Sequence, residues 1–314
     1  MMKRIKQITL IMVLIAMLML AACGEKTPSA DIESVQNSVA ESVYENAPEP
    51  ITGSIGGEWS VIALARSDYG PGDEYYDKYY GNLCKHVKEM KGDLSSSKFT
   101  EYARPSMALA AIGKNPEDVE GYDLMKPAAD FNFVKKQGIN GPVFALIAAN
   151  MCGYKPVLIK EDEYIEYILS CEIEGGGFSL EGSKGSPYID ITAMVVQALS
   201  FYIDNDEVKE AVDRAVDVMA DMCQKSDGYD SSESISQTII ALTAAGIDPV
   251  TDDRFAMNGK NLVDVLCEYK TDNNMFEHEK GEGGDTMATE QALCALDAVV
   301  LYKEGTLLYE KGKL

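Results

Sequence analysis

Histidine, tryptophan and closely spaced cysteines are scarce in this chain of 314 residues, which holds two histidines and a single tryptophan, Trp59. A zinc site needs three or four converging ligands, and His86 and His278 lie far apart in the sequence. The six cysteines after residue 23 form no dense framework and no Cys-x-x-Cys pair. We therefore expect no bound metal, no cofactor and unpaired thiols, with a disulfide in an exported chain as the alternative.

Positive charge is also scarce, with 28 Lys and Arg residues against 51 Asp and Glu residues. Three of the cations, Lys3, Arg4 and Lys6, precede residue 23, so removal of residues 1–22 leaves a formal net charge of −26. Such a charge disfavours binding to nucleic acid or to an anionic surface, and we expect no nucleic-acid partner. We interpret the acidity as a solvated exterior that prevents association. A cationic partner is the alternative, and no sequence motif supports it.

The first residues have the pattern of a bacterial lipoprotein signal. A basic start precedes the apolar run from Ile8 to Leu20, which is too short for a comfortable membrane span. The run ends in small residues before Cys23, the position that would receive the lipid. We expect a signal peptide over 1–22, lipidation of Cys23 and an extracytoplasmic protein anchored to a bacterial cell membrane. An ordinary secretory peptide is the alternative.

The segment after Cys23 is rich in Ser, Glu, Pro, Asn and Ala and has few large apolar residues. Such a composition cannot bury enough surface to offset the entropy of ordering the chain. We predict a flexible tether over 23–52 and a folded domain over 53–314. Because Val35, Val39 and Val43 fall at helical spacing, a marginal helix within the tether is the alternative.

A short apolar phrase ending in Ala-Leu returns six times in the rest of the chain, at spacings of 37 to 54 residues. Repeats of about this period are typical of one helical hairpin per repeat. The segments around the phrase are apolar nearly all round, so we expect helices that are buried on most sides. The repeated leucines are Leu64, Leu109, Leu146, Leu199, Leu242 and Leu296.

Amphipathic segments alternate with these buried helices. Between 207 and 225, apolar residues recur at steps of three and four, and charged residues take the opposite face. Similar segments cover 73–90, 123–136, 162–172 and 261–269. We predict an all-α fold in which an inner ring of six helices is wrapped by an outer ring of amphipathic helices, and we expect no strand of consequence.

Three stretches resemble a known repeat. They are Gly176-Gly177-Phe178 with Asp190-Ile191-Thr192-Ala193-Met194, Asp227-Gly228-Tyr229 with Ser236-Gln237-Thr238, and Ala288-Thr289-Glu290-Gln291. They are similar to the repeat of prenyltransferases and squalene cyclases. Their residue pattern most resembles that of bacterial surface proteins related to the cobalamin carriers of the intrinsic-factor type. The resemblance implies an α/α toroid. It does not imply one activity, because the family includes enzymes and carriers.

The catalytic motif of the family is incomplete in this chain. Class II terpene cyclases carry Asp-x-Asp-Asp and protonate an alkene with the middle Asp, and the matching stretch from Tyr188 to Ile191 keeps only Asp190. A strong general acid needs a neighbour that tunes its pKa. We therefore interpret Asp190 as a helix N-cap, like Ser236 and Asp285. An enzyme of the cyclase, prenyltransferase or lyase type that uses Asp190 with Tyr188 or Glu233 is the alternative.

In a toroid the first turns of the inner helices line one mouth. Counted back from the repeated Ala-Leu phrase, the positions in these turns carry large polar and aromatic side chains. We predict a non-catalytic protein that binds a small molecule, a glycan or a protein at this rim. A structural spacer is a third interpretation. The candidate ligand-binding residues are Trp59, Arg104, Tyr188, Asp190, Glu233, Gln237, Glu290 and Gln291.

Overall fold

The computed structural model describes residues 31–154, 160–225 and 229–311. Over these residues the chain forms twelve α-helices, several short 3-10 turns and one hairpin of two very short strands, β1 (Phe276–Glu277) and β2 (Gly284–Asp285). The prediction of an all-α fold is therefore confirmed. None of the described helices combines the length and the hydropathy needed to cross a membrane.

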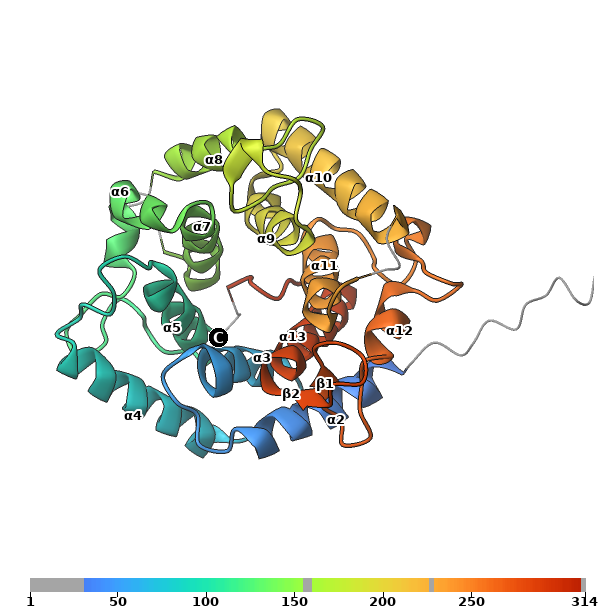
Figure 1. The fold of residues 1–314 in the computed structure, drawn as a ribbon. Coiled ribbons are helices and arrows are strands. Elements are labelled where there is room, and N and C mark those ends of the chain that lie inside the picture. The colour runs from blue at the N-terminus through green and yellow to red at the C-terminus, as the bar shows by residue number, and fades with distance from the viewer. Residues whose placement is uncertain (1–30, 155–159, 226–228, 312–314) are drawn as a thin grey trace, which may run out of the picture.

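The six Ala-Leu phrases lie in six separate helices, and all six of their leucines are fully buried. Each of these inner helices contacts the next one along the chain, and the last contacts the first, so their contacts form a closed cycle (Figure 1). The inner helices are α3 (Trp59–Arg66), α5 (Thr100–Ala111), α7 (Asn140–Cys152), α9 (Ile189–Leu199), α11 (Ser232–Ala244) and α13 (Thr286–Lys303).

The other six helices lie outside this cycle (Figure 1). They are α2 (Ile32–Asn46), α4 (Asp73–Glu89), α6 (Phe131–Val134), α8 (Glu161–Ser170), α10 (Asp206–Lys225) and α12 (Leu262–Cys267). The helix predicted over 123–136 is wrong. A separate 3-10 turn covers Lys126–Ala129, with Pro127 in its first turn. The Asp130 side chain then accepts a hydrogen bond from the Phe133 amide, which starts the four-residue α6.

The segment predicted as a tether contains α2, which packs against α13 and α3. Val39 and Val43 are buried in the core, and the Gln36 amide donates a hydrogen bond of 2.7 Å to the Asp297 carboxylate of α13. The tether prediction is therefore wrong over 32–46, because its apolar stripe has a matching surface on α13 that composition does not reveal. Cys23 and the predicted signal peptide lie outside the described residues.

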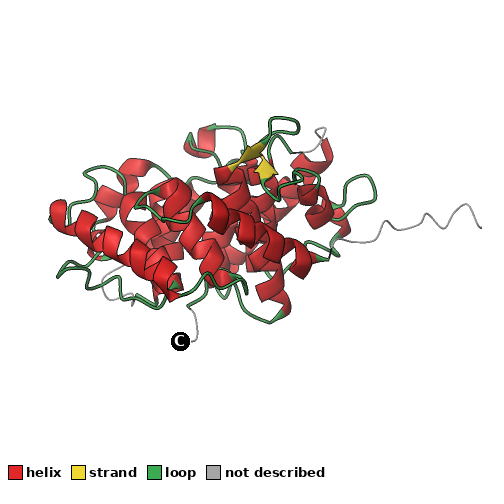
Figure 2. Ribbon diagram, turned by 90° about the horizontal axis from the view of Figure 1, so that it is seen from below, coloured by secondary structure: helices red, strands yellow, loops and turns green. Residues whose placement is uncertain are grey.

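Each outer helix leads into the next inner helix on the same side of the molecule. The hairpin β1–β2, which precedes α13, lies on this side, and the C-terminal end of the described chain lies on the other (Figure 2). We call this surface the entry face and the opposite surface the far face. The entry face consists of the first turns of the inner helices and segments 47–58, 90–99, 135–139, 171–188, 229–231 and 268–285.

Two repeats hold their entry segments in the same way. The backbone N–H of Phe178 donates to Thr192 Oγ1 at 3.0 Å, and that of Phe276 donates to Thr289 Oγ1 at 2.9 Å. Both phenylalanines are fully buried. Gly177, just before Phe178, has a φ of 81°, which a residue with a side chain adopts only with strain. The repeated threonine thus fixes the loop that positions the first turn of α9 and of α13.

Candidate functional site

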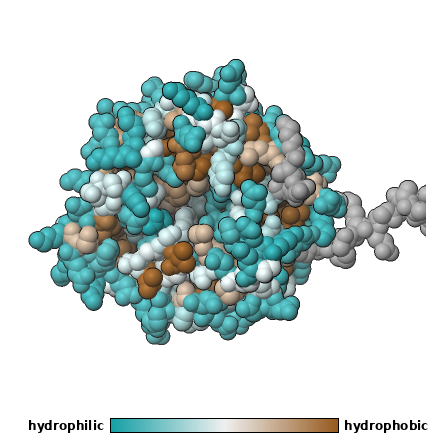
Figure 3. Space-filling view, viewed as in Figure 1, coloured by the Kyte–Doolittle hydropathy of each residue, from teal (hydrophilic) through white to brown (hydrophobic). Residues whose placement is uncertain are grey.

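Exposed apolar side chains gather on the entry face. Six large apolar residues are exposed among the described residues, and five of them lie on entry segments. Figure 3, which views this face, shows apolar side chains around its centre within a hydrophilic periphery. Exposed apolar side chains that concentrate on one face favour a binding surface there. The five residues are Ile51, Ile55, Met90, Leu180 and Tyr188.

An acid–histidine pair lies on the same face. Both carboxylate oxygens of Glu233, in the first turn of α11, lie within 3.0 Å of His278 Nδ1. The Glu233 side chain is 8 % exposed and the His278 side chain 49 % exposed, so the buried carboxylate anchors an imidazole that reaches solvent. The hydrogen bond that the imidazole donates to Glu233 is the main reason that the pKa of His278 is raised above its ordinary value.

Asp190 lies next to this pair but does not cap α9. The helix begins at Ile189 with Tyr188 as its N-cap, so Asp190 lies in the first turn and the predicted cap is wrong. Its Oδ1 atom is buried without a hydrogen-bond partner. Burial is the main cause that raises the pKa of Asp190, and the carboxylates of Glu233 and Asp230 raise it further.

Of the other two predicted helix caps, one is confirmed and one is wrong. The carboxylate of Asp285 accepts a hydrogen bond of 2.8 Å from the Ala288 amide and caps α13, as predicted. The Ser236 prediction is wrong, because Ser231 caps α11 while the Ser236 hydroxyl donates to the Ser232 carbonyl inside the helix. Sequence reasoning placed the cap too late because several serines in this segment fit the same role.

Tyr188 connects the acidic residues to the apolar patch. Its side chain is half exposed, and its backbone N–H donates to the Phe178 carbonyl at 2.9 Å, so the loop is held while the ring projects outward. The neighbouring Asp190 carboxylate is the main reason that the pKa of Tyr188 is raised. The structure thus brings together three sequence-predicted residues, Tyr188, Asp190 and Glu233, and adds His278.

Arg104 lies in a second cluster and its charge is balanced within the chain. Its Nη2 atom is 2.9 Å from Glu101 Oε2, and its Nε atom is 3.6 Å from Oε2 of the buried Glu58. The Tyr79 hydroxyl donates to Glu58 at 3.4 Å. Burial raises the pKa of Glu58, and Arg104 opposes that shift. Arg104 therefore compensates a buried acid, and its side chain is only 13 % exposed.

Glu290, another predicted candidate, is buried at the second turn of α13. Its Oε1 atom accepts hydrogen bonds from the Gly56 amide at 2.8 Å and from the Ser60 hydroxyl, while Oε2 has no partner. Burial raises the pKa of this carboxyl to about 7. Glu290 thus joins α13 to the entry segment of α3 and is not open to a ligand.

The remaining candidates face the interior of the helix cycle. The Gln197 amide donates to Gln237 at 2.9 Å, and the Gln237 amide donates to Gln291 at 3.0 Å, which links α9, α11 and α13. Trp59 of α3 packs against Phe144 of α7, with ring centroids 6.3 Å apart. Trp59, Gln237 and Gln291 remain partly exposed, and Tyr188 is the most exposed of the candidates.

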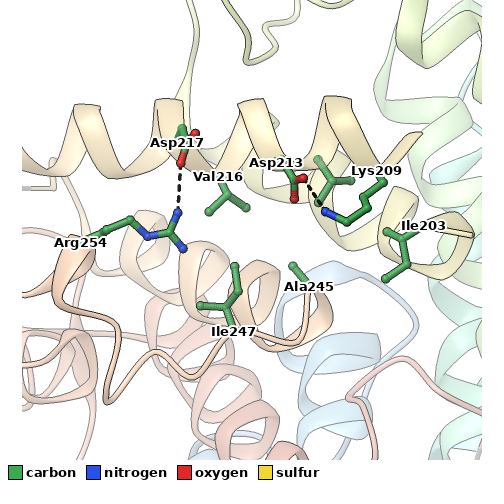
Figure 4. A pocket seen from close by; sticks show the side chains of 9 residues that line it. Ile203, Lys209, Asp213, Val216, Asp217, Ala245, Ile247 and Arg254 are labelled. Carbon is green, nitrogen blue, oxygen red and sulfur yellow. Dashed lines mark hydrogen bonds and ion pairs between the residues drawn. The ribbon is translucent and has the colours of Figure 1, made fainter. Parts of the chain in front are cut away.

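Two cavities of the described structure lie away from these candidates. One of about 360 Å³ lies under α10, and Figure 4 shows Lys209 and Arg254 at its two ends. Lys209 pairs with Asp213, and Arg254 with Asp217 at 3.0 Å, so both cations are neutralised. Another, of about 250 Å³, lies where α5 and α7 end. On the entry face, a cavity beside Glu58 has only about 50 Å³.

His278 is the site residue that sequence reasoning missed. It lies in the loop of the β1–β2 hairpin, 45 residues from Glu233, and the Ser232 amide at the start of α11 donates to the His278 carbonyl at 3.1 Å. The described residues contain no group of three or more His, Cys, Asp or Glu side chains arranged to hold a metal. No family model, no curated protein and no solved structure matches this chain.

Proposed function

We propose that the chain is an α/α toroid of the prenyltransferase and squalene cyclase type and acts as a non-catalytic binding protein. Its site is the entry face, where it takes up a ligand that is a small molecule, a glycan or a protein. In the same proposal, a lipid on Cys23 anchors it outside the cell at a bacterial membrane. The closed cycle of inner helices supports the fold assignment.

The observation that carries the binding proposal is the concentration of exposed apolar side chains on one face. Leu180 is 62 % exposed and Tyr188 51 % exposed, although the hydrogen bonds of the loop between them hold both in place. Holding apolar side chains in contact with water costs free energy, and a ligand that covers these side chains would offset that cost. The candidates buried in the interior, Arg104 and Glu290 among them, then position the loops and do not touch the ligand.

A double substitution tests this site. We expect L180S together with Y188S to weaken binding to the best ligand from glycan and peptide arrays at least about tenfold, because both side chains lose their apolar contact. The matched control is I203S, which removes an exposed apolar side chain from the far face. Surface plasmon resonance measures the affinities. Equal losses in both variants, or a loss only in I203S, would move the site elsewhere.

A second candidate function is acid catalysis by Asp190. The observation that favours it is the raised pKa of this carboxyl next to the Glu233–His278 pair, since proton donors work best with a pKa near the ambient pH. The absence of the two partner positions of the cyclase motif, held here by Tyr188 and Ile191, counts against it.

An isosteric substitution separates the two functions. If Asp190 donates a proton, D190N lowers turnover of any isoprenoid or polysaccharide substrate by at least about a hundredfold. If the protein only binds, we expect no product from such substrates, measured by mass spectrometry, with wild type or variant. Turnover that is equal in wild type and D190N would exclude Asp190 as the acid.

A further inference from the structure

The charges on the entry face are distributed unevenly. Exposed lysines predominate in the segments that lead into α5 and α7, namely Lys91, Lys98, Lys135 and Lys136. The segments that lead into α9, α11 and α13 contain more acids than lysines, although Lys184 and Lys280 are exposed there. We call the group formed by Asp190, Asp230, Glu233 and His278 the acidic corner.

The acidic corner has more negative charge than its own cations balance. Of the cations in the same segments, His278 is held by Glu233, Lys280 by Glu268 and Lys270 by Asn274, which leaves the exposed Lys184 of the loop before α9. Neither Asp190 nor Asp230 takes part in an ion pair within the described residues, and Glu279 and Glu282 add two further carboxylates near His278. Since like charges in proximity repel, a cation that docks here relieves this repulsion.

An aromatic and an apolar side chain project beside these carboxylates. Tyr188 lies close enough to Asp190 and Asp230 for both to raise its pKa, and Leu180 protrudes from the same loop. An aromatic face next to carboxylates suits an Arg or Lys side chain, because the ring quadrupole and the negative charges both attract the cation. Leu180 provides a contact for an apolar neighbour of that cation.

The shape of the entry face favours a polypeptide over a small molecule. The cavities of about 360 and 250 Å³ lie elsewhere, whereas side chains at the acidic corner protrude. Protruding loops fit between the side chains of an extended partner, and the excess of acids in the segments before α9, α11 and α13 favours a cationic one. Resting on the proposed function, we propose that the entry face binds a basic polypeptide segment with an apolar or aromatic residue beside its Lys or Arg residues, and that this segment lies over the acidic corner.

Blocked, fluorescent peptides test this inference. We expect a peptide of Lys and Phe in a Gly-Ser background to bind, with affinity that falls as salt rises, and the matching Glu and Phe peptide to bind at least about tenfold more weakly. D190N together with D230N should weaken the Lys and Phe peptide about tenfold. The control D204N with D206N removes equal charge beside the far face and should change affinity less than about twofold.

The outcomes distinguish this inference from the proposed function. Equal effects of the two double variants, or no binding of the Lys and Phe peptide, overturn the inference. If a neutral glycan then binds and L180S with Y188S abolishes that binding, the proposed function stands without the inference. Hydrogen exchange with the bound peptide should protect 178–190, and protection confined to the far face overturns both. Thermal melting shows that the variants are folded.

Discussion

Substitution of Val39 by Asp is expected to lower the free energy of unfolding by about 4 kcal/mol, or to detach α2 from the domain. Val39 is fully buried, and α2 packs on α13 and α3, so the new carboxylate is removed from water. Detachment would also expose Asp297, whose carboxylate bonds to Gln36. Chemical denaturation measures the loss.

The matched control is N37D, which places the same residue on the exposed side of α2. We expect its stability to stay within about 0.5 kcal/mol of wild type. A Glu-specific protease gives a second readout, because V39D should open α2 to cleavage at Glu41 and Glu45 even if the rest of the domain stays folded. Equal stability and equal cleavage of the two variants would contradict the docking of α2.

Stability should fall as the pH rises from 5 to 8, and Glu290 should account for about 2.5 kcal/mol of the fall. Its pKa is about 7 in the folded protein against an ordinary value of 4.5. A folded-state pKa that is raised contributes stability that is fully present below pH 4.5 and is lost as the pH rises through 7. Asp190 and Glu58, whose pKa values are also raised, add to the same trend.

The variant E290Q should remove that part of the pH dependence. A glutamine still accepts the hydrogen bond from the Gly56 amide but carries no charge to bury. Urea unfolding at pH 5 and pH 8 measures the difference in slope. The control E33Q changes an exposed carboxyl on α2, and its stability should vary with pH as that of wild type does. A slope in E290Q that matches wild type would show that Glu290 titrates normally.

The inner helices could be predicted because their signal is local. A segment that is apolar all round must be buried, and the buried Leu64 and Leu296 belong to the same repeated phrase. The failure at α2 has the opposite cause. Its stripe is short and its neighbours are polar, so its stability depends on α13, which the sequence alone does not place beside it.

The candidate site was predicted only in part for the same reason. Tyr188 and Asp190 are neighbours in sequence, and their place before a repeated phrase points to the entry face. The partner of Glu233 could not be found, because His278 approaches it through pairing in a hairpin that is two residues long on each strand. Interior candidates such as Gln237 have the right position in the repeat, but only packing shows that they face inward.

The closed contact cycle has a consequence for the order of synthesis. The hydrogen bond between Gln36 and Asp297 joins residues 261 apart in the chain, and the one between Gly56 and Glu290 joins residues 234 apart. A ribosome delivers α2 and α3 first, so the surfaces that these helices pack against α13 have no partner until α13 has been made. Until then the growing chain exposes an unpaired apolar surface to which a chaperone or a neighbouring chain can bind.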